Sequence, residues 1–238
     1  MINPTESENK YIIVTDTACD LSQEMLDSLG IIALPMHVII HGEDYLHYAD
    51  YRNLSKEDFF DMLKKYDDVT TSQVDLTAAE DTLRSLAESG KDILYIAFSS
   101  GLSGTYSAVK MIGEDLSEEF PERKIFVIDS LCASGGEGLL CYLAAKKKKG
   151  GLSIEELLDW IENNKLRICH WFTVDDLDHL KRGGRISAAT ATIGGLLKIK
   201  PIMYMEGSSH SELQGCRTQH VTRRNSEQNG KALRHPGV

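Results

Sequence analysis

Short apolar runs alternate with amphipathic segments along most of the chain. Residues 11–15, 93–98 and 125–129 are short and rich in β-branched side chains, which is typical of buried strands. Residues 22–29 carry apolar side chains at helical spacing, and the Gly30 that follows suits the end of a helix. Strands that alternate with helices predict an α/β fold with a parallel sheet built from βαβ units.

The segments between these strands give further predictions. Residues 31–40 and 167–174 are dominated by apolar side chains, so we expect one strand in each. We expect the polar stretch 67–75 to be a loop, and a helix over residues 77–88. A hydroxyl residue precedes an acidic residue by three positions at two predicted helix starts, Ser55 with Asp58 and Thr77 with Glu80, which is the pattern of a capping box. Residues 153–156 open a further predicted helix.

Composition divides the chain into three stretches. Residues 1–150 hold the predicted parallel sheet and end in a lysine-rich helical turn with a Gly-Gly stop, which we take as a domain boundary. Residues 151–206 begin a second α/β lobe. Residues 207–238 have no aromatic side chain and a local charge of +3 from five Lys/Arg and two Asp/Glu. We expect this tail to be disordered or poorly packed, and a frameshift would also produce so abrupt a change.

The charge balance excludes several kinds of partner. The 238 residues include 26 Lys/Arg and 36 Asp/Glu, which gives a net charge of −10. Such a chain lacks the basic surface that non-specific nucleic-acid binding needs. No apolar run approaches the roughly 18 residues of a membrane helix, and residues 1–10 do not have the pattern of a signal peptide. We therefore expect a cytoplasmic protein with reduced cysteines, no nucleic-acid partner and no stable membrane insertion.

The sequence lacks complete metal-binding and catalytic patterns. His37, His41 and His47 have no Cys or acidic partner at a recognised metal-ligand spacing, so we expect no metal and no other cofactor. Ser107 and Lys110 match the S-x-x-K pattern, but they fall inside a predicted helix and lack its companion motifs. Neither of the common Gly-rich phosphate motifs occurs. We predict no catalytic residue.

Hydroxyl side chains are instead concentrated in two predicted loops. The first holds Thr70, Thr71 and Ser72, and the second holds Ser99, Ser100, Ser103 and Thr105. Hydroxyls together with helix N-terminal amides can form a cradle for a carboxylate or a phosphate. Ordinary N-capping also places Ser and Thr at such positions. The glycine-rich segments 101–104 and 135–138 would offer further backbone N–H groups to an anion.

Five ordered motifs between residues 11 and 206 together resemble the DegV family. They are Asp16 after a strand, T-T-S-Q at 70–73, S-S-G-L-S-G-T-Y at 99–106, D-S and A-S-G at 129–135, and L-K-R-G-G-R-I at 180–186. Proteins of this bacterial family bind fatty acids, and some are the acyl-carrying subunit of the fatty acid kinase. The resemblance implies a two-lobe DegV-like fold with a parallel sheet in the N-terminal lobe and, in this chain, an incomplete second α/β lobe.

The resemblance also implies roles for individual residues. Thr71 and Ser100 match the hydroxyls that hold the fatty acid carboxylate. The remaining matched positions are the loop neighbours Ser72, Gly101 and Ser103, and the basic motif residues Arg182 and Arg185 near the mouth of the pocket.

The chain departs from the family pattern at two places. Val74 and Asp75 stand where the family usually has Pro and Ser, although Asp75 can still cap the following helix. Family members also continue past residues 200–202 with elements that complete the second lobe, where this chain has the polar tail.

We expect a lipid-binding carrier rather than an enzyme. In this interpretation the protein binds a long-chain fatty acid between its lobes and presents the carboxylate to a fatty acid kinase subunit. The alternative is an enzyme or sensor that holds a small phosphorylated metabolite in the same cleft, with Arg182 and Arg185 as charge clamps. A domain without a ligand is the third possibility.

Overall fold

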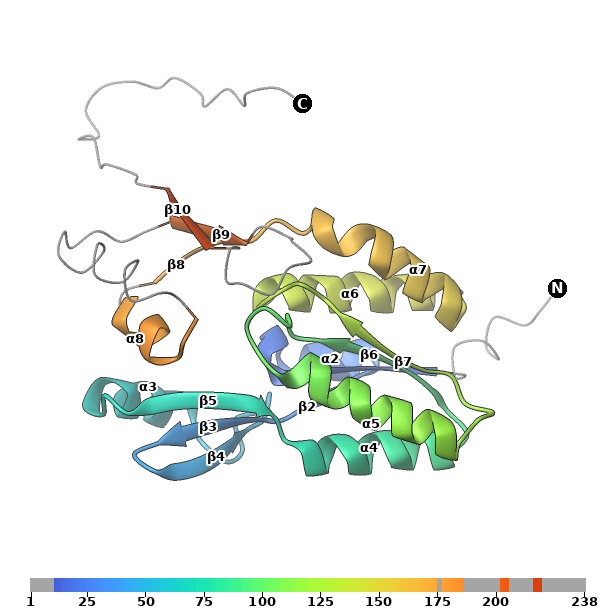
Figure 1. Ribbon diagram of the computed structural model, residues 1–238, viewed down its shortest axis with the longest axis horizontal. Helices are drawn as coiled ribbons and strands as arrows, with labels where there is room; N and C mark the ends of the chain where they lie inside the picture. Colours follow the sequence, from blue (N-terminus) through green and yellow to red (C-terminus); the bar gives the residue numbers. More distant parts are fainter. Residues whose placement is uncertain (1–10, 175–176, 186–201, 206–215, 220–238) are drawn as a thin grey trace, which may run out of the picture.

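The computed structural model of the protein describes residues 11–174, 177–185, 202–205 and 216–219, with side chains up to residue 185. Its centre is a four-stranded parallel sheet (Figure 1). The strands are β1 (Tyr11–Asp16), β2 (Ile31–Leu34), β6 (Asp92–Ala97) and β7 (Ile125–Asp129), in the order β2-β1-β6-β7. The predicted α/β fold with a parallel N-terminal sheet is therefore confirmed.

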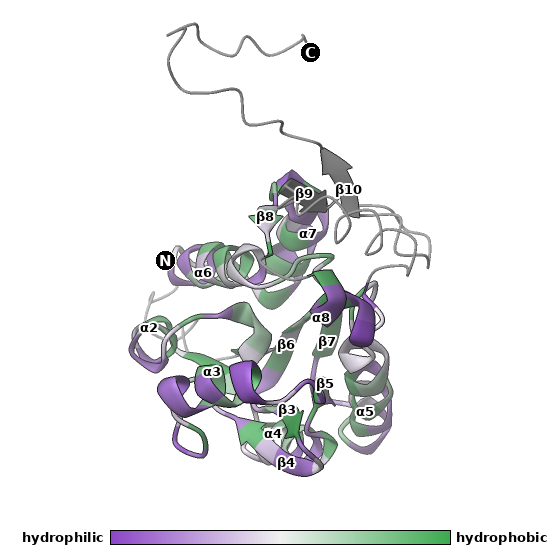
Figure 2. Cartoon of the chain, turned by 90° about the vertical axis from the view of Figure 1, so that its left-hand side faces the viewer, coloured by the Kyte–Doolittle hydropathy of each residue, from purple (hydrophilic) through white to green (hydrophobic). Residues whose placement is uncertain are grey.

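Helices cover both faces of this sheet. The first layer contains α2 (Gln23–Leu29), α6 (Gly135–Lys149) and α7 (Ile154–Asn164), and the second contains α4 (Leu76–Glu88) and α5 (Thr105–Glu119). Neighbouring residues of a strand point to opposite faces. Ile13 accordingly packs into the first layer and Val14 into the second, and both side chains are fully buried. Figure 2 shows both hydrophobic and hydrophilic residues along the helices around the sheet, as expected for helices with one buried face.

A small antiparallel sheet lies beside the parallel one. It consists of β3 (Met36–Ile40), β4 (Glu43–His47) and β5 (Val69–Val74), in the order β4-β3-β5, and α3 (Lys56–Lys65) packs against it. The prediction of one strand over residues 31–40 was wrong. Pro35 separates β2 from β3 because it has no N–H to donate to a strand pairing, and the chain passes there from one sheet to the other.

The prediction of a loop over residues 67–75 was also wrong, because β5 occupies most of this stretch. Val69 and Val74 at its ends are buried, whereas Thr70, Thr71 and Ser72 are exposed. An exposed polar middle gives no alternating hydrophobic pattern from which a strand could be predicted. Antiparallel pairing with β3 nevertheless supplies the backbone hydrogen bonds.

Three of the predicted helix starts are confirmed and one is corrected. Ser22, Ser55 and Ser153 each accept a hydrogen bond from a backbone N–H in the first turn of the following helix. Thr77 does not cap α4. The cap is Asp75, whose Oδ1 accepts from the N–H of Ala78 at 2.6 Å, so the carboxylate predicted to replace the family's Ser does cap this helix.

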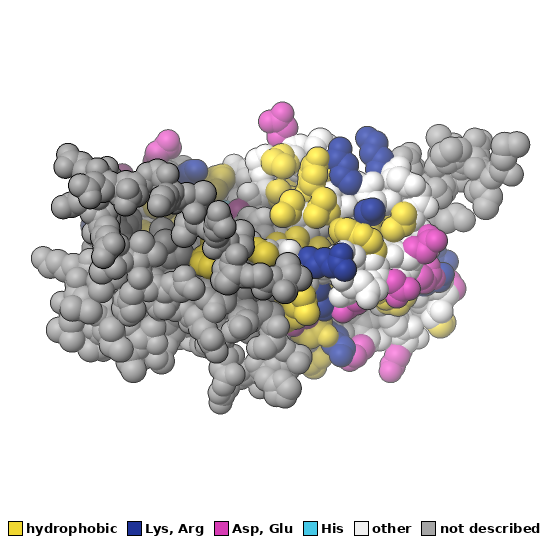
Figure 3. All heavy atoms as spheres, turned by 90° about the horizontal axis from the view of Figure 1, so that it is seen from above, with side chains coloured by type: hydrophobic (Ala, Val, Ile, Leu, Met, Phe, Trp, Pro, Cys, Tyr) yellow, Lys and Arg dark blue, Asp and Glu magenta, His cyan; other side chains and the backbone are white. Residues whose placement is uncertain are grey.

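The Gly150-Gly151 turn joins two helices that share one core. Ile154, Leu157 and Ile161 of α7 are buried in the same cluster as β1 and α6. The helix after the predicted boundary therefore packs with the first lobe, and the division at residues 150 and 206 stays a prediction. The lysines before the turn also pack on neighbours, for Lys147 Nζ lies 5.4 Å from the ring centre of Trp160. In the view from above, cationic and apolar side chains lie next to one another (Figure 3).

The later elements are short. The predicted strand over 167–174 is reduced to β8 (Trp171–Thr173), which follows the turn η2 (Lys165–Arg167), and α8 (Leu177–Arg182) comes next. β8 pairs with β9 (Ile202–Met205), and β9 pairs with β10 (Cys216–Gln219), both antiparallel. The strand β10 corrects the expectation of an unpacked tail for four of its residues. The rest of residues 207–238, and Ile186 of the family motif, lie outside the described residues. No helix in the described part of the chain has the length and apolar character to cross a membrane.

Candidate functional site

The C-terminal ends of β1, β6 and β7 meet at one edge of the parallel sheet, as expected for parallel strands. The N–H of Phe98, just after β6, donates to Asp16 Oδ2 at 3.1 Å, and Asp16 is the last residue of β1. The N–H of Ser100 donates to Oδ1 of Asp129, the last residue of β7, also at 3.1 Å. The segment 98–104, which we call the Ser100 loop, is therefore held between two carboxylates.

The antiparallel strand β5 reaches this edge from the side. The N–H of Val74 donates to Thr105 Oγ1 at 3.1 Å, and Thr105 Oγ1 lies 3.0 Å from Ser103 Oγ. Gly104 faces Gln73 so closely that a Cβ on the glycine would lie 2.8 Å from Gln73 Oε1. The two hydroxyl-rich segments predicted from the sequence are therefore in contact.

The structure places the predicted carboxylate-binding residues on these two segments. Thr71 and Ser72 are exposed on β5, Ser100 and Gly101 are exposed in the Ser100 loop, and Ser103 is half-buried beside Thr105. Within the described part of the chain, neither Thr71 nor Ser100 uses its hydroxyl in a hydrogen bond, so both hydroxyls are available to a ligand. Their assignment as ligand-binding residues stays a prediction.

The backbone N–H groups of the Ser100 loop are donated inside the protein. Phe98 donates to Asp16 Oδ2, Ser99 to the carbonyl of Cys132, and Ser100 to Asp129 Oδ1. Gly101 donates to Ser99 Oγ, and Leu102 and Ser103 donate to the carbonyl of Ser99. All six distances are 3.0–3.3 Å. The expectation that the start of the glycine-rich segment 101–104 offers N–H groups to an anion is therefore wrong.

The backbone N–H groups of residues 136–138, in the second glycine-rich segment, are also donated to acceptors within the protein. The N–H of Ala133 donates to His170 Nε2 at 3.3 Å, and the N–H groups of Gly136, Glu137 and Gly138 donate to backbone carbonyls. A Cβ on Gly136 would lie 1.8 Å from His170 Nε2, so the imidazole occupies the space over the start of α6. Burial lowers the pKa of His170, and a ring nitrogen that accepts from an N–H belongs to the neutral form.

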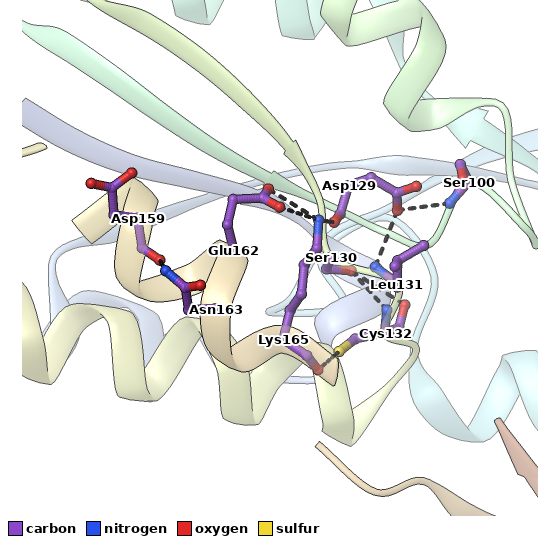
Figure 4. Close-up of polar contacts among 9 residues, drawn as sticks. All are labelled: Ser100, Asp129, Ser130, Leu131, Cys132, Asp159, Glu162, Asn163 and Lys165. Carbon is purple, nitrogen blue, oxygen red and sulfur yellow. Dashed lines mark hydrogen bonds and ion pairs between the residues drawn. The ribbon is translucent and has the colours of Figure 1, made fainter. Parts of the chain in front are cut away.

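Lys165 supports the Ser100 loop from the far side of Asp129 (Figure 4). Lys165 Nζ donates to the backbone carbonyl of Asp129 at 2.9 Å and forms an ion pair with Glu162 at 2.8 Å. Asp129 Oδ1 also accepts from the N–H of Leu131 at 3.1 Å. The junction of α7 and η2 is thereby connected to Ser100. The sequence reasoning missed Lys165, since nothing in its local pattern distinguishes it from other helix-terminal lysines.

The basic motif lies at the end of α8. Figures 1 and 2 both place α8 on the side of the molecule where β5 lies. Arg182 is exposed, whereas Arg185 is half-buried and its guanidinium donates to the carbonyl of Gly183. Gly184 adopts a φ of +72° and lets the chain leave the helix. A role for either arginine in binding an anion stays a prediction.

Two of the three histidines considered for a metal, His37 and His41, have carboxylate neighbours instead. His37 lies between Asp44 and Asp75, at 2.9 Å from Nδ1 and 3.0 Å from Nε2, and thereby connects β3 and β4 to the cap of α4. Among the residues whose placement is described, no group of three or more His, Cys, Asp or Glu side chains could hold a metal ion.

Comparison with known proteins identifies related chains. The family described as "Uncharacterised protein, DegV family" matches residues 10–225, which extends past residue 206, where we expected the family-like sequence to end. A DegV domain-containing protein of Clostridium perfringens is 43% identical over 196 residues, which are 82% of this chain and 67% of the relative.

Two solved structures are similar in fold as well as sequence. A stearic acid-binding protein of Eubacterium ventriosum has a TM-score of 0.77 and 26% identity, over 90% of this chain and 71% of its own. DegV of Bacillus subtilis, described as a fatty acid binding protein, has a TM-score of 0.68 and 30% identity, over 84% of this chain and 69% of its own.

Proposed function

The chain belongs to the DegV family, and from this premise we propose that it binds a long-chain fatty acid and holds the carboxylate with Thr71 and Ser100. The observation that carries the proposal is the hydrogen bond from Val74 to Thr105, because it joins the two segments on which these hydroxyls lie. The binding of stearic acid by the Eubacterium ventriosum protein supports the choice of ligand.

The arrangement of the backbone favours a carboxylate over a phosphate. Phosphate sites usually use several convergent backbone N–H groups. In residues 98–103 and 136–138 these groups are donated to protein acceptors. Two hydroxyl donors are adequate for a carboxylate, whose charge is smaller. The alternative of a small phosphorylated metabolite is therefore less favoured.

The hydrocarbon chain supplies most of the affinity in this proposal. Burial of about 14 methylenes of a sixteen-carbon acid, at roughly 0.8 kcal/mol each, contributes on the order of 11 kcal/mol before the cost of binding. Each hydroxyl bond to the carboxylate adds about 1.5–3 kcal/mol. The hydroxyls therefore mainly orient the head group. We place Ser72, Gly101, Ser103, Arg182 and Arg185 around it, with the acyl chain between the two lobes.

The protein acts in this proposal as a carrier and has no catalytic residue of its own. It presents the fatty acid carboxylate to an ATP-dependent kinase subunit, which transfers the phosphoryl group. The exposure of Thr71 and Ser100 is compatible with access by such a partner.

Native mass spectrometry of the full chain tests the ligand. Protein purified under non-denaturing conditions is expected to carry a fatty acid, or to bind added stearate after delipidation. A co-purifying phosphorylated metabolite would favour the alternative. Protein that stays free of ligand after incubation with stearate would contradict fatty acid binding. Phosphorylation of the bound acid by a fatty acid kinase and ATP tests the partner separately.

A further inference from the structure

The contacts of the Thr15 hydroxyl indicate the protonation state of the buried Glu137. Thr15 Oγ1 lies 2.8 Å from the carbonyl oxygen of Ile96, 3.0 Å from Glu137 Oε1 and 3.5 Å from Cys141 Sγ. A hydroxyl has one hydrogen and two lone pairs. The carbonyl can only accept, so the hydrogen of Thr15 points to Ile96. Cys141 and Glu137 must then donate to Thr15, and Glu137 can donate only as a neutral carboxylic acid.

Asp16 has the opposite environment. Its Oδ1 accepts from the N–H of Ala18 and its Oδ2 from the N–H of Phe98, both at 3.1 Å. Two amide donors stabilise the charged form of a carboxyl group. Burial raises the pKa of Asp16 to about 6, which still leaves the group ionised at neutral pH. Burial, and then the charge of Asp16, raise the pKa of Glu137 well above its usual range.

The other titratable groups around this pair are Tyr95 from β6, Cys141 from α6, Cys19, Cys132 and the exposed Asp20. Burial raises the pKa of Tyr95 and of the three thiols, so all four are neutral near pH 7. Asp16 and Glu137 are both fully buried. The pair therefore shares a single negative charge, which lies on Asp16.

The charged Asp16 lies where its carboxylate can hold a backbone N–H at the start of the Ser100 loop. Backbone pairing between β1 and β6 is recorded as far as Val14 and Tyr95. Beyond that pair, the side chains of Thr15 and Asp16 hold the carbonyl of Ile96 and the N–H of Phe98. Phe98 begins the Ser100 loop, so Asp16 fixes the point from which Ser100 projects.

We propose that Asp16 is a positioning residue for ligand binding at Ser100, and that Glu137, which contacts the neighbouring Thr15, keeps its proton so that the two buried carboxyl groups carry one charge. The inference rests on the proposed fatty acid binding for its first half only. The protonation of Glu137 follows from the contacts of Thr15 and does not depend on any ligand.

A matched pair of substitutions tests both halves on the full chain. Glu137→Gln replaces the neutral acid by a group of the same shape that donates to Thr15. We expect it to fold, to bind stearate like the wild type and to lose the infrared band of a protonated carboxyl group. In Asp16→Asn one side-chain oxygen remains to accept from the N–H of Ala18 or of Phe98, and the other N–H faces an NH2 group that cannot accept. We expect it to bind stearate about ten-fold more weakly.

Several outcomes would overturn the inference. They are an Asp16→Asn variant that folds and binds as the wild type does, a Glu137→Gln variant that does not fold, and an infrared band that persists in Glu137→Gln. If Asp16→Asn does not fold, the Phe98 amide NMR resonance of the wild type decides. It should shift when Asp16 is protonated on acidification, and a resonance that stays unchanged down to the pH of acid unfolding would show that Asp16 does not hold the Phe98 N–H. A wild type that binds no stearate contradicts the proposed function and leaves the infrared test intact.

Discussion

The backbone N–H of Val74 donates a hydrogen bond to Thr105 Oγ1, at 3.1 Å and between residues that are both buried. The bond joins the last residue of β5 to the first residue of α5, although the two residues lie 31 positions apart. Thr71 precedes this contact on β5, and Ser100 precedes it in the Ser100 loop. The bond therefore helps to set the spacing between the hydroxyls of Thr71 and Ser100, which we propose bind the carboxylate.

Replacement of Thr105 by valine tests this connection. Thr105→Val keeps the shape of the side chain and leaves the buried N–H of Val74 without an acceptor, which we expect to cost about 1–3 kcal/mol in the free energy of unfolding. Urea denaturation measures the loss. Thr105→Ser keeps the hydroxyl and serves as the control. Equal stabilities of the valine and serine variants would show that the bond contributes nothing.

The double variant Thr71→Ala with Ser100→Ala tests whether these two hydroxyls bind the carboxylate. Loss of two hydroxyl bonds to a carboxylate, each worth about 1.5–3 kcal/mol, should weaken fatty acid binding by about a hundred-fold or more. Calorimetric titration with stearate measures the change. Thr70→Ala is the matched control, because neighbouring residues of a strand point to opposite faces. Unchanged affinity in the double variant would contradict the assignment.

The sequence predicted the fold where the signal is local. Residues 11–15, 93–97 and 125–129 fall in strands because each is a short run dominated by apolar, often β-branched side chains. The split of residues 31–40 was missed even though Pro35 marks it. β5 was missed because its exposed threonines carry no hydrophobic alternation, and its partner β3 is distant in sequence.

The candidate site was predictable only in part for the same reason. The hydroxyl-rich motifs are visible in the sequence, but their contact is a tertiary fact, because β5 belongs to the antiparallel sheet and the Ser100 loop follows a strand of the parallel one. The acceptors for the amides of Phe98 and Ser100, the support from Lys165 and the proton on Glu137 depend on contacts over 29 to 122 positions. No local pattern encodes such pairs.

Gly136 is predicted to tolerate no larger side chain while His170 is present. In Gly136→Ala the new Cβ would lie 1.8 Å from His170 Nε2, and such a clash costs about 1–3 kcal/mol of stability. His170→Ala removes the clash and also the acceptor for Ala133. We expect the double variant to be more stable than the sum of the two single losses predicts, measured as a double-mutant cycle by urea denaturation. Additive losses would show that the imidazole does not occupy this space.

The neutral state of His170 predicts a dependence of stability on pH. Burial holds the pKa of His170 below the ordinary value of 6.5 in the folded protein, so the unfolded chain binds more protons between the two values. The free energy of unfolding contributed by this group is therefore complete above about pH 6.5 and falls as the pH decreases towards the folded pKa. Protonation would also turn the acceptor for the Ala133 N–H into a donor.

Urea denaturation of the wild type and of His170→Gln, at several pH values between about 5 and 8, measures this contribution. Glutamine can still accept from Ala133 and does not titrate. Burial also lowers the pKa of His47, so both proteins should lose stability on acidification, but the wild type should lose more. The difference between the two curves should be constant above pH 6.5 and change below it, because only His170 differs between them. Parallel curves over the whole range would mean that His170 titrates alike in the folded and unfolded chains, and that its imidazole does not depend on the Ala133 contact.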